Sequence, residues 1–409
     1  MTPASPPAGP QAHRAARIAV AVLFLTNGAI LANLLPRYPQ IKADLGLTNA
    51  QYGLAVASFP FGALMAGLAA GGIIRRFRSS RVAVAGTVLT GLGLLLAGLA
   101  PSWAALAVTL LLAGSMDAIT DVAQNAHGLR VQRLYGRSIL NSFHALWSVG
   151  AVVGGLMGGL AAGLDVPRGL HLGLSALLFS GVSLTALRFL LPGPEPTEAS
   201  GPGDVHTEGA SAKRGAGRLR LVLSMAALVL IASSGVLVED AGMTWAAVYL
   251  SGTLGAGVAV ASLGYVALVG AQFIGRLFGD RLVDRFGQRA VARTGGLLAA
   301  LGMGGALLFP SVPATVVGFA FAGFGVATLV PAAMHGADEL PGLRPGTGLT
   351  VVSWLMRMGF LLSPPVVGLI ADAAGLRRGL LVVPLAGGLV MALAGVLSAR
   401  RVTAPRGGG

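Results

Sequence analysis

Long apolar runs separated by short polar segments dominate the chain. Runs of this kind are typical of membrane-crossing helices, because about 20 apolar residues are needed to span the hydrocarbon core of a bilayer. The pattern predicts twelve spans, six in each half, over residues 17–35, 52–74, 81–99, 104–127, 138–163, 170–191, 221–250, 256–278, 289–309, 313–334, 347–371 and 379–399. Lipid offers the backbone no hydrogen-bond partner, so we expect every span to be α-helical. The predicted fold is therefore an all-α membrane protein.

The two halves repeat particular residues in one constant register. The pairs separated by 209 positions are Arg76-Phe77 and Arg285-Phe286, Gly114 and Gly323, Gly150 and Gly359, and Gly159-Leu160 and Gly368-Leu369. Glycine makes up 62 of the 409 residues, so the shared register carries more weight than any single match. A parallel duplication of apolar spans is typical of secondary transporters, whose substrate site lies between the two halves near mid-membrane.

A polar segment rich in proline, glycine and serine divides the two sets of spans. We predict a tail over 1–16, a six-helix bundle over 17–191, a cytoplasmic linker over 192–220, a second six-helix bundle over 221–400 and a second tail over 401–409. A linker of this composition is flexible and carries no core of its own. The two bundles are expected to be pseudo-symmetric.

Composition supports the membrane assignment and excludes other classes. Hydrophobic residues make up 54% of the chain and charged residues 11%, whereas soluble domains carry about 25% charged residues. The net charge of +14 would suit a nucleic-acid partner, but the bases lie in short segments between apolar runs rather than on one polar domain. With no cysteine, no phosphate-binding glycine loop and no metal-ligand spacing, we expect neither enzyme activity nor a cofactor or metal.

The basic residues predict the orientation. The segments assigned to the cytoplasm hold Arg14, Arg17, Arg75, Arg76, Arg78, Arg81, Arg130, Arg133, Arg137, the bases from Arg276 through Arg293, and Arg344. The outer segments hold only Arg37, Lys42, Arg168, Arg377 and Arg378. This excess predicts a multi-pass protein of the plasma (inner) membrane with both termini in the cytoplasm. The first apolar run is long and lacks a cleavage site, so we expect an uncleaved first helix.

The loop between the eighth and ninth spans reads Asp284-Arg285-Phe286-Gly287-Gln288-Arg289. It resembles the D-R-x-G-R-R signature of the major facilitator superfamily. The resemblance implies that Asp284, Arg285, Gly287 and Arg289 form a conformational latch between neighbouring helices at the cytoplasmic face. In the first half Arg75 replaces the acid and Arg78 the glycine, so that loop fits a simple positive-inside anchor better.

About the first 160 residues carry a second resemblance. Its motifs are Leu34-Leu35-Pro36, Leu47-Thr48-Asn49-Ala50-Gln51-Tyr52-Gly53, Phe59-Pro60-Phe61-Gly62, Asp121-Val122-Ala123-Gln124-Asn125, Asn141-Ser142-Phe143-His144 and Ser148-Val149-Gly150-Ala151. They are similar to fucose:proton symporters and related uncharacterised bacterial permeases. The resemblance implies that Asp121 is the acid of the fourth helix. The acid expected in the first helix falls near Ala29, so sugar specificity is not implied.

Few polar residues lie inside the predicted spans, and a charge at a helix centre costs about 2.5–3.5 kcal/mol on insertion scales. Asp117, Asp121 and Asn125 share one face of the fourth span, with Gln124 beside them. That face is either a polar seam between helices or a cavity wall whose carboxylate loads and releases protons. The fifth span adds a face of Asn141, His144 and Ser148 flanked by Trp147. His144 is a relay or a structural histidine, and Trp147 a stacking surface or a space filler.

The second half holds two further candidates. Arg357, beside Ser353 and Trp354, requires an anionic partner supplied by the protein or by a substrate. Glu239 and Asp240 lie about 27 Å along the seventh span from Leu221. This distance leaves open a place in the cavity, a solvated outer rim, or a helix break that forms an outer gate with Trp245. Pro60, Pro331 and the Pro364-Pro365 pair predict kinks.

These features predict a monomeric secondary active transporter that moves a small molecule by alternating access, with proton-coupled symport of a sugar-like or other polar solute as the leading reading. A proton-antiport exporter of drugs or amphipathic metabolites and a non-transporting membrane sensor stay open. The residues assigned to proton coupling are Asp121, Asp117 and Glu239, and those assigned to the substrate are Asn125, Gln124, Asn141, His144, Trp147, Arg357 and Trp354. The expected partners are the solute, protons and the lipid bilayer, without nucleic acid.

The orientation can be tested by labelling. A cysteine introduced at Thr197 and one introduced at Arg168 should react with an impermeant thiol reagent from opposite sides of the membrane, because an odd number of spans separates them. Labelling of both from the same side would overturn the assignment of the spans.

Overall fold

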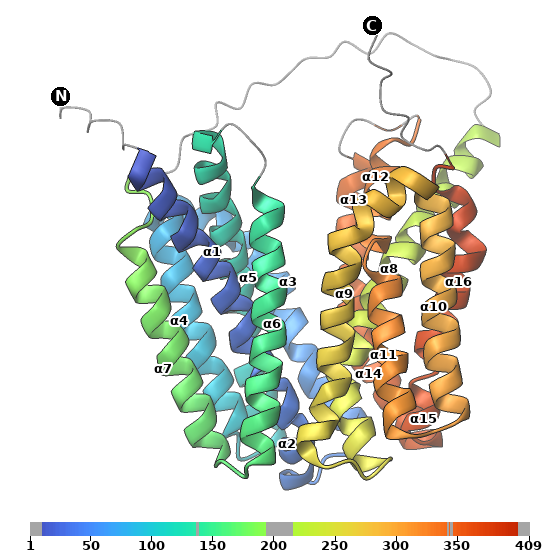
Figure 1. Ribbon diagram of the computed structural model, residues 1–409, viewed down its shortest axis with the longest axis horizontal. Coiled ribbons are helices and arrows are strands. Elements are labelled where there is room, and N and C mark those ends of the chain that lie inside the picture. The colour runs from blue at the N-terminus through green and yellow to red at the C-terminus, as the bar shows by residue number, and fades with distance from the viewer. Residues whose placement is uncertain (1–9, 136–138, 194–215, 342, 344–346, 400–409) are drawn as a thin grey trace, which may run out of the picture.

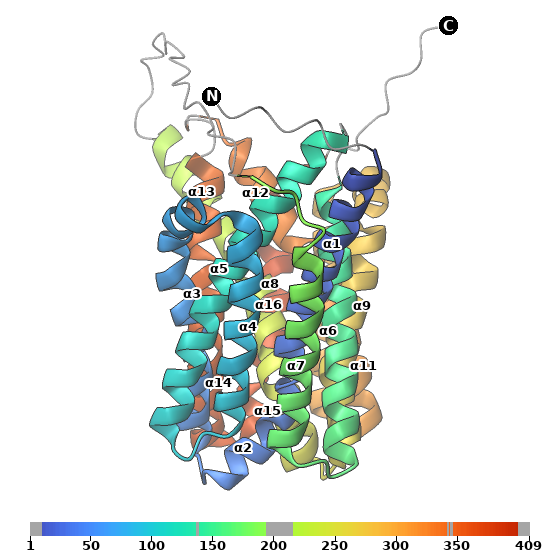
Figure 2. The ribbon, with the colours of Figure 1, turned by 90° about the vertical axis from the view of Figure 1, so that its left-hand side faces the viewer.

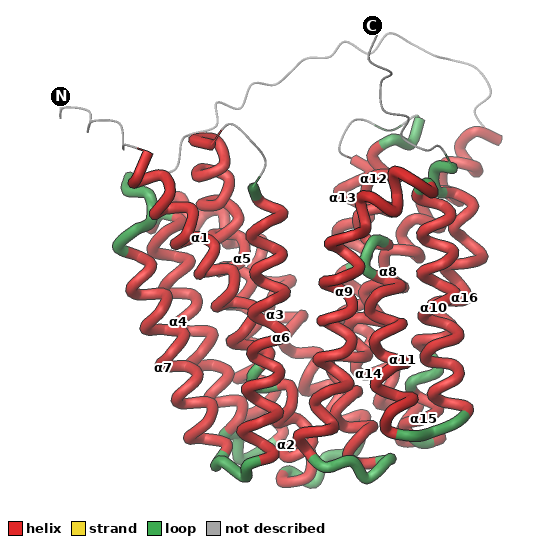
Figure 3. The backbone as a smooth tube through the Cα atoms, viewed as in Figure 1, coloured by secondary structure: helices red, strands yellow, loops and turns green. Residues whose placement is uncertain are grey.

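Helices make up every regular element in the part of the chain that the structure describes, which is residues 10–135, 139–193, 216–341, 343 and 347–399 of a computed structural model (Figure 3). The first half contains α1 (Pro10–Ala32), η1 (Leu35–Arg37), α2 (Tyr38–Asp44), α3 (Asn49–Phe77), α4 (Ser79–Gly98), α5 (Trp103–Tyr135), α6 (Leu140–Gly163) and α7 (Arg168–Leu187). The second contains α8 (Ala216–Gly252), α9 (Val258–Phe286), α10 (Gln288–Leu308), α11 (Val312–Val326), α12 (Leu329–Asp338), α13 (Thr347–Leu355), α14 (Arg357–Ala374), α15 (Leu376–Gly379), α16 (Val382–Leu393) and η2 (Ala394–Val396). Twelve segments of these helices are long and apolar enough to cross a membrane, which confirms the predicted fold class.

The helices form two bundles that stand side by side, α1 to α7 in one and α8 to α16 in the other (Figures 1 and 2). We call the end at which α1 begins the α1 end, and the opposite end, which holds α2, the α2 end. In Figure 1 the bundles come together at the α2 end. Contacts between them are made by α3 with α14, by α6 with α9, and by η1 and α2 with α8.

The duplication is visible in the helix boundaries and in the packing. The bounds of α3 and α9 are Asn49–Phe77 and Val258–Phe286, so the two helices match end to end at the offset of 209 positions. A Cβ atom at Gly114 would overlap the carbonyl oxygen of Phe59, and one at Gly323 would overlap that of Leu268. Both positions of this contact, the glycine and the carbonyl that it approaches, recur at the offset of 209. Glycine is needed there because helices in lipid associate through close backbone approach rather than a hydrophobic driving force.

Several predicted boundaries differ from the structure. The first helix begins at Pro10 and α8 begins at Ala216, so parts of the predicted tail 1–16 and linker 192–220 are helical. Hydropathy marks only the part of a helix that suits hydrocarbon, whereas the backbone continues as helix into the interface. Residues 194–215 of the linker, Thr197 included, and the tail 401–409 lie outside the described residues.

The predicted tenth and eleventh spans are each divided into two helices. The first division falls between α11 and α12, three residues before Pro331, and the second at Met356, between α13 and α14. By contrast Pro60 lies inside an unbroken α3, and Pro364 and Pro365 lie inside α14. A proline in the sequence therefore marks a missing backbone donor, but it does not locate the breaks.

A hydrogen-bonded contact joins the bundles at the α2 end. The Asp372 carboxylate, on α14, accepts hydrogen bonds from the backbone N–H groups of Asn49 and Ala50, both at 2.8 Å, at the start of α3. These donors have no partner within their own helix, and the positive end of the helix dipole favours an anion there. Deeper in the same interface the Tyr52 hydroxyl donates to the carbonyl oxygen of Thr244 at 2.9 Å.

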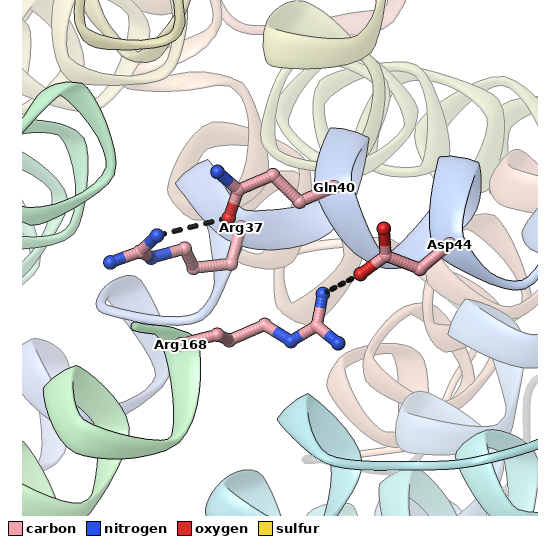
Figure 4. Close-up of polar contacts among 4 residues, drawn as sticks. All are labelled: Arg37, Gln40, Asp44 and Arg168. Carbon is pink, nitrogen blue, oxygen red and sulfur yellow. Dashed lines mark hydrogen bonds and ion pairs between the residues drawn. The ribbon is translucent and has the colours of Figure 1, made fainter. Parts of the chain in front are cut away.

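Two arginines fix α2 within the first bundle (Figure 4). Arg168, at the start of α7, forms an ion pair with Asp44 at 2.7 Å. Arg37 is 1% exposed and donates to Gln40 Oε1 at 2.9 Å, to the carbonyl oxygen of Val166 at 2.9 Å and to His171 Nδ1 at 3.4 Å. Arg37 was predicted to be a base of an outer segment, whereas in the structure it is buried and bridges η1 and the start of α7.

The turns after α3 and α9 share an unusual backbone conformation. Gly287 has φ 82° and ψ 153°, and Arg78, its counterpart at the offset of 209, has φ 74° and ψ 142°. Positive φ suits glycine and strains a residue that carries a Cβ, at a cost of about 1–3 kcal/mol. Arg78 thus stands at a position where the motif has glycine and where the backbone conformation still favours glycine.

Arg78→Gly should therefore stabilise the protein. We expect the free energy of unfolding to rise by about 1 kcal/mol, because relief of backbone strain exceeds the added entropy of the unfolded glycine. The midpoint of thermal unfolding in detergent measures the effect. Arg78→Ala, which keeps the Cβ, should give no gain, and Gly287→Ala should lower the midpoint. Equal gains from Arg78→Gly and Arg78→Ala would show that the side chain, not the backbone, is the cause.

Candidate functional site

The polar face predicted on the fourth span meets the fifth span through a chain of hydrogen bonds. Asn125 Nδ2 donates to Asp121 Oδ1 at 3.0 Å, and His144 Nε2 lies 3.2 Å from Asn125 Oδ1. Because an amide oxygen only accepts, His144 carries its proton on Nε2 in this contact. Asp121 and His144 are both exposed. The structure thus brings Asp121, Asn125 and His144 together, in the order carboxylate, amide and imidazole.

A second chain runs parallel to the first, one turn away on both helices. Asn27 Nδ2, on α1, donates to Asp117 Oδ1 at 2.8 Å, and Trp147 Nε1 donates to Asn27 Oδ1 at 2.9 Å. Trp147 therefore orients an amide and a carboxylate, a role that differs from both sugar stacking and simple space filling. We did not predict Asn27, although a lone amide in an apolar span was a signal in the sequence. A cavity of about 20 Å³, the room of about one water, is lined by Asn27, Asp117, Trp147, Met243 and Tyr265 among others.

The second half contributes a separate polar group. Glu239 Oε2, on α8, accepts a hydrogen bond from Gln272 Nε2 at 2.7 Å and lies 3.6 Å from Arg276 Nη2, both on α9. The side chain of Glu239 is 14% exposed and that of Arg276 is 42% exposed. Arg276 lies inside α9, nearly three turns before the end of that helix at Phe286, and its assignment to a cytoplasmic segment stays a prediction. Gln272 was missed.

Charged groups of the two halves act on each other across this region. Asp121 lies within electrostatic range of Arg357, on α14, and His144 lies within range of Arg276. Arg357 is exposed and makes no hydrogen bond or ion pair with the described residues. An acidic and a basic group of the first half, Asp121 and His144, are therefore each within electrostatic range of an arginine of the second half.

Some predicted site residues lie elsewhere. Gln124 is 1% exposed and donates to the carbonyl oxygen of Leu23 at 3.2 Å, so it joins α5 to α1, and its role toward a solute stays a prediction. Ser148 is buried and donates to the His144 carbonyl within α6. Trp354, on α13, is 52% exposed and makes no hydrogen bond or ring contact with the described polar residues. The side chain of Asn141 lies outside the described part of the chain.

The solvated rim and the outer gate expected for Glu239 and Asp240 were both wrong. Asp240 is 8% exposed, so it is not on a solvated rim, and α8 runs unbroken from Ala216 to Gly252, so there is no broken-helix gate at this point. Trp245 is fully buried and packs edge-on against Tyr52 of the first half at 5.0 Å. The distance along the helix misled us because α8 begins earlier and extends further than its apolar run.

The residues of the predicted latch loop make local contacts, which do not test their role as a latch. Arg289 Nη2 donates to the carbonyl oxygen of Gly395 at 2.7 Å and Nε donates to that of Leu397 at 3.1 Å, which ties α10 to the end of η2. Gly287 supplies the positive φ of the turn. The Arg285 guanidinium lies over the Phe286 ring at 5.4 Å, and Asp284 is exposed without an ion pair to the described residues. A latching role for Asp284 stays a prediction.

Comparison with known proteins establishes the family. The profile of the Major Facilitator Superfamily matches residues 19–271 and 240–408. The chain belongs to the Major Facilitator Superfamily. It is 32% identical over 383 residues to the uncharacterized transporter y4wD of Sinorhizobium fredii, which covers 92% of this chain and 97% of the relative. The chain is thus a membrane transporter.

Solved structures show the same fold at low identity. The nucleoside transporter NupG superposes with a TM-score of 0.70 at 14% identity, covering 92% of this chain and 97% of its own. A D-xylose-proton symporter superposes with a TM-score of 0.66 at 14% identity, covering 93% and 96%. At such identities the likeness extends to the arrangement of helices and not to the solute.

The role of Asn27 can be tested by stability. Asn27→Leu should lower the free energy of unfolding by about 1–3 kcal/mol, because it leaves the Asp117 carboxylate and the Trp147 N–H without partners in a partly buried place. Asn125→Leu, the same change in the more exposed chain, should have a smaller effect since water replaces its bonds. Thermal unfolding in detergent compares the two variants. Equal losses would show that the bonds of Asn27 contribute no more than those of Asn125.

Proposed function

We propose that this transporter is proton-coupled and moves a small polar solute by alternating access between the two bundles, as a monomer in the plasma membrane with cytoplasmic termini. The observation that carries the proposal is Asp121. Its carboxylate is exposed between the halves, joined through Asn125 to His144, and within electrostatic range of Arg357 of the other half. An ionisable group at this depth is costly and is typical of ion and proton pathways.

Proton loading at this site has a simple physical basis. Asp117 and Asp121 are one helical turn apart on α5 and repel each other when both are ionised. Two such carboxylates titrate as a pair, and binding of one proton removes the repulsion. Asp117 is held by Asn27, whereas Asp121 is the exposed member. We therefore assign proton exchange with the aqueous phase to Asp121, and the paired Glu239 is less suited to it.

The direction of transport is a separate question from proton coupling. The same carboxylate pair serves symport or antiport, since either requires only that proton and solute binding be linked. Symport is favoured here because Asp121 and Arg357 are oppositely charged and face each other. Protonation of Asp121 removes its attraction for Arg357, so Arg357 becomes available to a solute. In antiport the proton would instead displace the solute.

Asp121→Asn tests the assignment. In proteoliposomes the variant should lose solute accumulation driven by a pH gradient, because the amide cannot bind and release a proton. Exchange of solute at equal concentrations on both sides should persist, since the site and its hydrogen-bond geometry are kept. Asp117→Asn is the matched control on the same helix face. Accumulation by Asp121→Asn at the parent rate would exclude Asp121 as the coupling residue and leave Asp117 or Glu239.

A further inference from the structure

We propose that the transported solute is a small organic acid in its monoanionic form. Its carboxylate binds the Arg357 guanidinium and replaces ionised Asp121 as the anion that attracts this guanidinium. This inference rests on the proposed proton-coupled function and adds the chemical class of the solute. It follows from which charges at the site are already compensated within their own half and which are not.

Arg357 is the uncompensated cation of the described site. Arg276 has Glu239 at 3.6 Å within its own bundle, and Glu239 is held in turn by Gln272. Arg357 has no such partner among the described residues, and its side chain is exposed at the start of α14. A guanidinium at membrane depth needs an anionic partner, and its planar fork fits a carboxylate through two parallel hydrogen bonds.

The charge count favours a single negative charge on the solute. A phosphate ester carries close to two charges and would require a second free guanidinium, whereas Arg276 is already paired with Glu239. An amine or other cation would be repelled by Arg357 and Arg276 together. A neutral sugar would leave Arg357 without an ion partner whenever Asp121 is protonated. A carboxylate satisfies Arg357 and leaves no charge unpaired.

Competition between Asp121 and the solute would link proton and solute binding. Ionised Asp121 weakens binding of the acid in two ways. It competes with the solute carboxylate for Arg357, and its own negative charge repels that carboxylate. A proton on Asp121 removes both effects, so proton and anion bind together. One proton and one monoanion carry no net charge, which predicts transport that is driven by the pH gradient and is insensitive to membrane potential.

Other groups that face Asp121 act on the same equilibrium. Asp117 lies one turn away on α5, His144 faces it from α6, and Arg357 faces it from α14. Beyond His144 lies Arg276 of α9, which is paired with Glu239 of α8. Protonated His144 would also favour an anion, so His144→Gln is needed to separate its contribution from that of Asp121.

A ligand panel on the purified full-length protein tests the inference. The probes are gluconate, quinate, lactate and benzoate, with glucitol, benzyl alcohol and glucosamine as neutral or cationic counterparts. Thermal unfolding detects binding, since a ligand of the native state raises the midpoint by mass action. At least one acid should raise the midpoint, and more so at pH 5.5 than at pH 7.5. Its counterparts should not.

Two variants connect the effect to the proposed residues. Asp121→Asn should bind the same acid with a weaker dependence of the affinity on pH, and in the His144→Gln background Asp121→Asn should abolish that dependence. Arg357→Lys should weaken binding about tenfold by losing the bidentate contact, with an unfolding midpoint close to that of the parent without ligand. Stabilisation by none of the acids, or by a neutral or cationic probe alone, would overturn the inference.

Transport measurements distinguish a failure of this inference from a failure of the proposed proton coupling. In proteoliposomes with an internal pH indicator, the stabilising acid should enter with protons at a rate unchanged by a potassium diffusion potential. Proton flux driven by a neutral probe would retain the proposed coupling and exclude an anionic solute. Binding of an acid without any proton flux would retain the anion site and exclude the coupling.

Discussion

Within a bilayer a polar side chain must find its partner inside the protein, and the described polar network depends on this constraint. Each half satisfies most of its own groups: Asp117 through Asn27 and Trp147 in the first half, and Glu239 through Gln272 and Arg276 in the second. The Asp121 carboxylate and the Arg357 guanidinium form no ion pair with the described residues of their own halves. The two bundles can therefore move as bodies, and the charges that remain between them are the ones available to a solute.

Backbone approach gives each bundle the rigidity for such movement. Gly114 on Phe59 and Gly323 on Leu268 are the same contact in both halves, and neither has room for a Cβ atom. Close contacts of this kind favour one arrangement of neighbouring helices over a continuum of arrangements. The helix division at Met356, between α13 and α14, directly precedes Arg357.

The sequence was sufficient to predict features that depend on period and on offset. Spans follow from hydropathy, the duplication follows from its register, and the shared face of Asp121 and Asn125 follows from their spacing. Partners on other helices, Asn27, Gln272 and Arg276, could not be predicted, because one sequence does not say which helices are neighbours. Gln124 shows that residues next to each other in the sequence need not share a site. It is next to Asn125, yet successive residues point about 100° apart on a helix, and Gln124 faces α1.

Duplication did not make the two seams at the α2 end chemically alike. Asp372 of α14 accepts hydrogen bonds from the first N–H groups of α3. Its counterpart at the offset of 209 is Gly163 of α6. A Cβ atom at Gly163 would overlap Ala259 at the start of α9. One seam is thus held by an ion against a helix dipole. The other is held by close packing and by the hydrogen bond that the Tyr265 hydroxyl donates to the carbonyl oxygen of Ala151 at 3.3 Å. Ionic strength and acidity act on the first and leave the second unchanged. The two sides of the contact between the bundles at the α2 end therefore differ in how strongly salt and pH act on them.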